Sequence, residues 1–190
     1  MKHFELILLL LGATFIAKGQ KLPDSLYFIQ KMIGFTPGET RIGYTDRLET
    51  GFLNNFKRAF KTTTIKGVNS EFKPAIFEFT EKEIEVINKK LSEFEKPYWT
   101  KDLFPNSTLL VLDSLDAILA DPKRGWSYFH GKYGDMFCQF TDPIFLRNNT
   151  ICIIQVYYKS DDRKGKHELS IYKASNGIWH RELLIFAGSW

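Results

Sequence analysis

The chain has 190 residues, of which 44% are hydrophobic, 25% charged and 15% aromatic. So much aromatic surface requires a packed interior, which excludes a disordered, collagen-like or coiled-coil protein. The 26 basic and 22 acidic residues nearly balance, at a formal charge of +4, so the charge predicts no nucleic-acid partner.

The N-terminus has the layout of a secretory signal peptide. A short charged start precedes an apolar run from Leu6 to Ile16, which is shorter than the roughly 20 residues that a helix needs to cross a bilayer. Small Ala17 and Gly19 occupy the two positions that a signal peptidase reads, so we expect cleavage before Gln20. The alternatives are an uncleaved membrane anchor or a buried helix.

This layout predicts an exported protein. Residues 1–19 would be removed, and residues 20–190 would form a single domain in the periplasm or outside the cell. No later segment reaches membrane-spanning length, so no membrane span is expected after cleavage.

Helices are expected mainly in the N-terminal half of the domain. Apolar residues at helical spacing predict a short helix over 23–32 and a second over 48–60, followed by a polar connector over 62–73. The clearest helix covers 81–95, because residues 80–83 form a capping box ahead of it.

Shorter elements flank this helix. Their residues predict a strand-like run over 77–79, a buried strand over 109–112, a short helix capped by Asp113 or Ser114, and a helical turn over 125–131.

From residue 135 onward the pattern changes to strands. Turn residues, above all Asn176-Gly177, separate four of them and predict an antiparallel meander. The fold class is therefore α+β, with N-terminal helices packed on this C-terminal sheet. The expected strands are 136–146, 150–159, 167–174 and 178–187, with a charged loop over 160–166.

The only two cysteines are Cys138 and Cys152. If Asn148-Asn149 forms a two-residue turn, Cys152 lies opposite Phe145, seven residues from Cys138. That places the thiols roughly 24 Å apart and on opposite faces of the sheet, beyond the reach of a disulfide. We expect two buried thiols and no disulfide.

Packing and turn residues recur in five segments: Phe79 through Trp99, Trp126–Phe129, Pro143–Phe145, Ile151–Val156 and Asn176–Trp179. In these the chain resembles a group of exported bacterial proteins without an assigned function, over roughly the last 110 residues. Some members carry a Gly- and Cys-rich tip where this chain has the charged residues 159–166. The resemblance implies an exported domain and no catalytic residue.

The motifs of common enzyme classes are absent from the sequence. The 13 glycines never take phosphate-loop spacing, and Gly125-Trp126-Ser127 only begins a nucleophile elbow. Neither cysteine lies at metal-ligand spacing from a histidine. We therefore expect no cofactor and no metal site.

Two histidines remain as catalytic candidates. His180 and Glu182 share one face of the last expected strand, with Lys173 opposite His180, and an imidazole held by a carboxylate acts as a general base near neutral pH. His130 lies in an aromatic stretch. The structural interpretation is a polar solvent face for the first site and a packed aromatic cluster for the second.

Four aromatic residues are candidates for a surface that stacks on a sugar or a peptide: Trp126, Tyr157, Tyr158 and Trp179. Core packing is the alternative role. Because Tyr157 and Tyr158 are adjacent in a strand, one of them must point away from whatever its neighbour faces.

These observations favour an exported, non-enzymatic binding or interaction module for a protein or a glycan. The alternative is a small hydrolase or isomerase with a histidine–carboxylate pair in a sheet-lined pocket, which rests on fold-level analogy. A histidine hydrogen-bonded to a carboxylate in such a pocket would favour the enzyme.

Overall fold

The computed structural model describes residues 28–29, 41–99, 107–161 and 163–189. The expected signal peptide lies outside them, as does most of the helix expected over 23–32, of which Phe28 and Ile29 are helical. In chain order the elements are β1 (Ile42–Thr45), α2 (Thr50–Ala59), β2 (Thr64–Val68), β3 (Pro74–Glu78), α3 (Glu81–Glu93), β4 (Ser107–Leu110), α4 (Leu112–Ala120), α5 (Gly125–Lys132), β5 (Met136–Phe140), β6 (Ile144–Leu146), β7 (Ile151–Asp161), β8 (Lys164–Ser175) and β9 (Ile178–Ser189).

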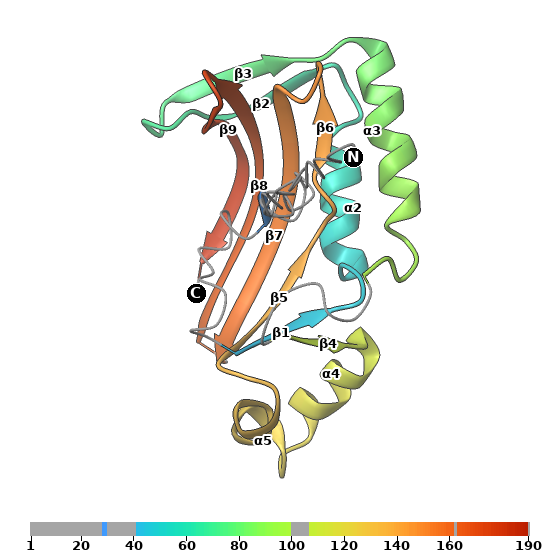
Figure 1. Ribbon diagram of the computed structural model, residues 1–190, viewed down its shortest axis with the longest axis vertical. Coiled ribbons are helices and arrows are strands. Elements are labelled where there is room, and N and C mark those ends of the chain that lie inside the picture. The colour runs from blue at the N-terminus through green and yellow to red at the C-terminus, as the bar shows by residue number, and fades with distance from the viewer. Residues whose placement is uncertain (1–27, 30–40, 100–106, 162, 190) are drawn as a thin grey trace, which may run out of the picture.

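The strands of the described residues form one nine-stranded sheet in the order β3-β2-β9-β8-β7-β5-β1-β4, with β6 paired to β7 (Figure 1). Its centre, β5-β7-β8-β9, is the predicted antiparallel meander. The antiparallel pair β2–β3 extends it at one edge, and the parallel strands β1 and β4 extend it at the other. The α+β class is confirmed, but the expected size of about four strands is too small.

Two turns of the meander test the sequence analysis. Asn176 and Gly177 take φ of 51° and 75° in a two-residue hairpin, so the predicted type I′ turn is confirmed. The predicted loop over 160–166 is wrong, because β7 and β8 stay paired as far as Asp161 and Lys164. Asp161, Lys164 and Lys166 therefore belong to strands and have fixed faces.

Two strands were missed because their sequences carry little alternation. Strand β2 lies within the expected connector over 62–73, and Ile65 is the buried residue among its five. Strand β1 is four residues long and buried throughout, which gives no alternation at all. Parallel pairing with β4 and β5 holds it, and such pairing is not visible in local sequence.

The element around residue 110 is shifted relative to its prediction. Strand β4 covers 107–110 rather than 109–112. Helix α4 begins directly after Val111, which is its N-cap and has extended backbone, so neither Asp113 nor Ser114 caps it.

Helices α2 and α3, both predicted, cover one face of the sheet (Figure 1). Phe56 and Leu91 from these helices are fully buried against Ile153, Ile171 and Leu183 of the sheet. Burying a side chain of this size contributes about 1.5–3 kcal/mol. None of the helices in the described residues has the length and apolarity to span a bilayer.

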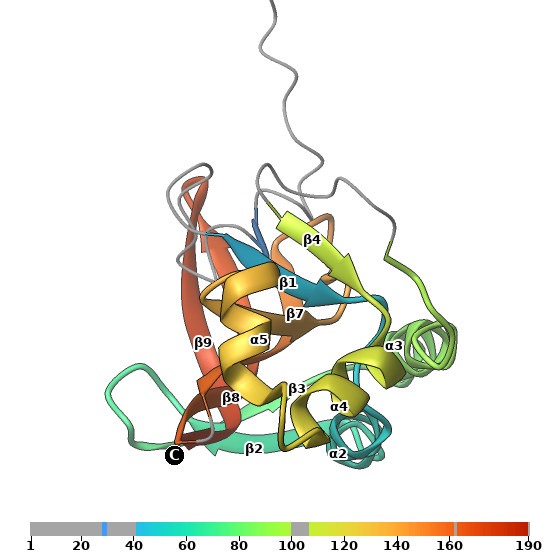
Figure 2. The same cartoon turned by 90° about the horizontal axis from the view of Figure 1, so that it is seen from below.

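Helices α4 and α5 lie together beside β1 and β4 (Figure 2). Leu115 and Phe129 from these helices pack with Phe137 and Tyr157 of the sheet. The helical turn expected over 125–131 is confirmed as α5.

The sheet face opposite α2 and α3 carries a second hydrophobic cluster. We call this face of the sheet the Glu168 face. Tyr44, Ile154 and Tyr172 are buried there with Phe28. The Phe28 ring meets those of Tyr172 and Trp179 edge-on, each at 5.2 Å between centroids.

Cys138 and Cys152 are both free and buried in this cluster. The expectation that they lie on opposite faces is wrong, because the break between β5 and β6 shifts the register along β7 by one residue. Cys152 lies opposite Phe145, as expected, whereas Cys138 lies opposite Tyr158. Six residues of β7 separate Cys152 from Tyr158, so the thiols are about 20 Å apart.

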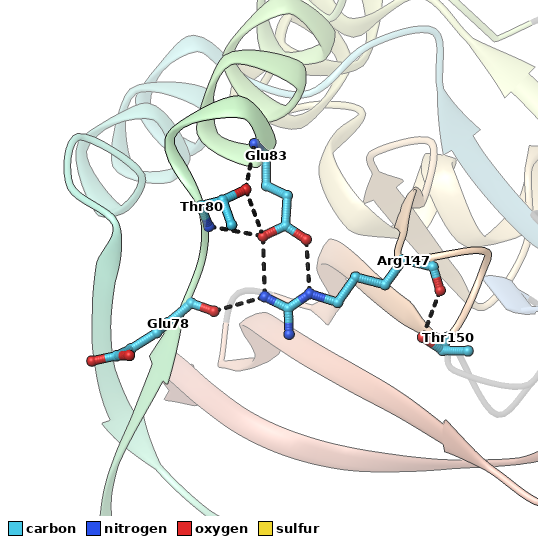
Figure 3. A network of polar contacts seen from close by, with 5 residues as sticks. All are labelled: Glu78, Thr80, Glu83, Arg147 and Thr150. Carbon is cyan, nitrogen blue, oxygen red and sulfur yellow. Dashed lines mark hydrogen bonds and ion pairs between the residues drawn. The ribbon is translucent and has the colours of Figure 1, made fainter.

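Arg147, in the turn between β6 and β7, holds the start of α3 (Figure 3). Its Nε and Nη2 donate to the two carboxylate oxygens of Glu83 at 2.7 and 3.0 Å, and Nη2 also donates to the Glu78 carbonyl at 2.8 Å. Glu83 completes the predicted capping box with Thr80. The hydrogen bond from Arg147 lowers the pKa of Glu83 to about 2.

Replacing Glu83 by alanine is expected to lower the free energy of unfolding by roughly 1.5 kcal/mol, because it removes a capping box and a bidentate ion pair that are worth about 1 kcal/mol or less each. Urea denaturation at pH 7 measures this. Glu81→Ala, in the same exposed helical turn, is the control and should cost less than about 0.5 kcal/mol. Equal losses in the two variants would show that neither the capping box nor the ion pair with Arg147 stabilises the fold.

Candidate functional site

On the Glu168 face, β7 and β8 place an apolar row of side chains beside a polar row. The direct pairs are Ile154–Ser170, Val156–Glu168 and Tyr158–Lys166. All six side chains point to one face and line a cavity of about 20 Å³. This volume holds about one water molecule, so the cavity is too small for a ligand of its own.

Glu168 is the centre of a polar cluster. Ser170 Oγ donates to its Oε1 at 2.6 Å, and Tyr172 OH and Arg181 Nη1 donate to the same oxygen at 3.3 Å. Lys166 Nζ lies 2.8 Å from Oε2. The carboxylate is thus buried with both of its oxygens engaged.

The cluster keeps Glu168 ionised. Burial by itself would raise the pKa of this carboxyl, but the hydrogen bonds from Lys166 and Ser170 and the charges of Lys166 and Arg181 outweigh burial and lower it. Burial and the neighbouring carboxylate raise the pKa of Tyr172. Two cations around one anion leave a net positive charge at the centre of the face.

Arg181 joins this cluster to the β2–β3 hairpin. Its Nε is buried and has no hydrogen-bond partner among the described residues. Its guanidinium carbon lies 5.8 Å from the centroid of the Phe72 ring, in the turn between β2 and β3. The positive charge of Arg181 is therefore next to the hairpin.

The hairpin extends beyond β9 (Figure 1) and carries exposed apolar side chains. Phe72 and Ile76 are 69% and 61% exposed, and Lys66 lies directly opposite Ile76. An open groove follows the two strands, lined by Lys66, Gly67, Pro74, Ala75 and Ile76. We call Lys66, Phe72, Pro74 and Ile76 the hairpin patch.

The backbone at Phe72 has an unusual conformation. Its φ of 59° is left-handed, which costs a residue with a side chain about 1–2 kcal/mol. Asn69 builds the turn: its carbonyl accepts from Phe72 N, and its Oδ1 accepts from the backbone N–H groups of Glu71 and Lys73. A strained backbone that holds a large apolar side chain in solvent is typical of a residue that contacts another molecule.

The structure places His180 and Glu182 on β9, both exposed. His180 lies opposite Lys173, as the sequence predicts. The register shifts at Glu182, between the pairs Tyr172–Arg181 and Ile171–Leu183, so strict alternation fails there. No hydrogen bond between these described residues joins the imidazole to the carboxylate.

His130 lies on α5 and packs against Trp126 at 5.5 Å between ring centroids. Its Nε2 donates to the Ser160 carbonyl at 2.7 Å. This bond ties α5 to the end of β7, so the geometry gives His130 a structural partner rather than a carboxylate.

The four aromatic candidates do not form one platform. Tyr157 is buried against Phe52, whereas Tyr158 points to the Glu168 face, as alternation requires. Trp179 packs against the Phe28 ring. Trp126, on α5, stacks on Phe137 of β5.

His167, which sequence analysis did not single out, is the most perturbed histidine of the described residues. It is buried beneath the ring of Phe52, 4.3 Å away, and burial lowers its pKa to about 4. Gln155 Nε2 donates to His167 Nε2 at 2.6 Å and to the Phe52 carbonyl at 3.1 Å. The amide thus holds a neutral imidazole between α2 and the sheet.

The Glu168 cluster and the hairpin patch were also missed. The alternation of Lys164, Lys166 and Glu168 was not recognised, because residues 160–166 were expected to form a loop. The sequence signal for the hairpin patch is Phe72, an aromatic residue within a polar segment. Arg181 lies opposite Tyr172, which shares one face of β8 with Glu168, and the sequence analysis did not connect these residues.

Within the described part of the chain, no group of His, Cys, Asp and Glu residues is arranged to hold a metal ion. Comparison with known proteins finds no matching family model, no matching curated protein and no matching solved structure.

Proposed function

We propose that this protein is an exported binding module that recognises a partner protein through the hairpin patch. The observation that carries the proposal is the exposure of Phe72 and Ile76 beside the cations Lys66 and Arg181. Clustered exposed apolar side chains with a polar rim mark interaction surfaces. The signal-peptide layout and the resemblance to exported bacterial proteins support the assignment to the periplasm or the cell exterior.

A protein partner fits the patch better than a glycan does. Sugars stack on flat aromatic faces, and the four aromatic candidates are divided among separate clusters. The hairpin patch instead combines an aliphatic side chain, a ring, a proline and cations, which suits apolar and charged side chains of a polypeptide.

Affinity capture from the periplasmic extract and culture medium of the source organism tests this proposal. Ile76→Ser is expected to reduce the amount of captured partner, measured by quantitative mass spectrometry, about tenfold relative to the wild type. Val86→Ser is the matched control, because Val86 is 47% exposed on α3, away from the patch. A partner retained equally by both variants, or a glycan bound on an array in an Ile76-dependent way, would contradict a protein partner at this site.

A further inference from the structure

The outer edge of β3 is closed to an added strand at both ends. Phe79 N donates to the Thr63 carbonyl, so the backbone N–H and C=O groups of the odd-numbered residues bond to β2. The backbone N–H and C=O groups of the even-numbered residues point away from β2, toward the free edge. At one end the outward residue is Pro74, which has no N–H. At the other end the outward carbonyl of Glu78 already accepts from Arg147 at 2.8 Å.

The middle of β3 leaves little to pair with. Among the described residues of β3, Ile76 alone has both a backbone N–H and a backbone C=O that face the free edge, because Pro74 lacks an N–H and the Glu78 carbonyl is occupied by Arg147. A partner strand needs a row of such groups, so this edge is protected against strand addition. Recognition at the hairpin patch must therefore use its side chains.

Those side chains are apolar and cationic. Phe72 and Ile76 supply the exposed apolar surface, and Lys66 has no ion pair among the described residues. Arg181 adds positive charge that is only partly balanced, because Glu168 is shared with Lys166. Lys73, beside the patch, is neutralised by Glu71 at 2.6 Å.

We infer that the partner presents an acidic, apolar peptide segment that lies across the hairpin patch, with carboxylates near Lys66 and near Arg181 and apolar side chains against Ile76 and Phe72. The inference rests on the proposed function and specifies the chemistry of its ligand. Opposite charge next to an apolar contact fixes orientation and excludes basic competitors.

Two fluorescein-labelled pools of random 12-residue peptides test the inference. Both pools have Leu, Ile or Phe at half of the positions. At the other half, the acidic pool has Asp or Glu and the basic pool has Lys or Arg. Fluorescence anisotropy with the wild-type protein should show the acidic pool binding about tenfold more tightly, with the difference reduced in high salt. Lys66→Glu should abolish or reverse this preference. Lys82→Glu, on the exposed surface of α3, is the matched control and should preserve it.

The outcomes separate the two proposals. Equal binding of both pools that is lost in Ile76→Ser would overturn the acidic chemistry and leave the proposed function standing. Binding of the acidic pool that is insensitive to both Ile76→Ser and Phe72→Ser, or no binding of either pool, would contradict the proposed function as well. Loss of affinity when alternate peptide nitrogens are methylated would show strand addition and overturn the inference.

Discussion

Replacing Glu168 by alanine is expected to lower the free energy of unfolding by about 3 kcal/mol. The carboxylate is buried and accepts from Ser170, Tyr172 and Arg181, with Lys166 at its other oxygen. Its removal leaves two cations facing each other without the anion between them, which costs more than the ion pair itself contributes. Urea denaturation at pH 7 provides the measurement.

Glu182→Ala is the control, because Glu182 is an exposed carboxylate on the neighbouring strand β9. We expect that variant to stay within about 0.5 kcal/mol of the wild type. The pKa of Glu168 is lowered, so its contribution is present above the ordinary value of 4.5 and is lost as pH falls through its folded value. A Glu168→Ala variant as stable as the control would show that the cluster does not stabilise the fold.

His167 is expected to make the protein less stable as pH falls from about 6.5 to 4. Burial lowers the folded-state pKa of this imidazole from 6.5 to about 4. Between these values the unfolded chain binds a proton that the folded protein does not, so protons favour unfolding. The full shift corresponds to about 3 kcal/mol, and residual screening by solvent reduces the expected loss to about 2 kcal/mol.

Unfolding curves of His167→Gln measured at pH 7, 5.5 and 4 check this expectation. Glutamine retains a side chain that can meet Gln155 but does not titrate in this range, so the variant should lose most of the slope between pH 6.5 and 4.5. His180→Gln, at an exposed position, should retain the wild-type slope. An unchanged slope in His167→Gln would mean that other groups cause the acid sensitivity.

The parts of the fold predicted from sequence are those with local causes. The capping box of Thr80 and Glu83 starts α3, and Asn176-Gly177 closes the β8–β9 hairpin, because both act within a few residues. Strand β1 depends instead on parallel partners more than 60 residues away in sequence, on β4 and β5. Pairing across such separations leaves no local pattern to detect.

The candidate site was harder to predict than the fold. Glu168 and Arg181 meet because Arg181 lies opposite Tyr172, which shares one face of β8 with Glu168, so the contact depends on pairing between two strands. The hairpin patch depends on β2, which was expected to be a connector. The burial of His167 could not be predicted from its local sequence, because it requires Phe52 of α2 to lie over the sheet.

The placement of the two cysteines gives a native structure that holds no disulfide between them. Cys138 and Cys152 share a buried apolar cluster but lie too far apart to form a disulfide, and burial raises the pKa of both thiols, that of Cys138 to about 12. Thiols kept protonated and inaccessible react slowly with oxidants and with other disulfides. We therefore expect the folded protein to keep both thiols reduced in reducing and in oxidising surroundings.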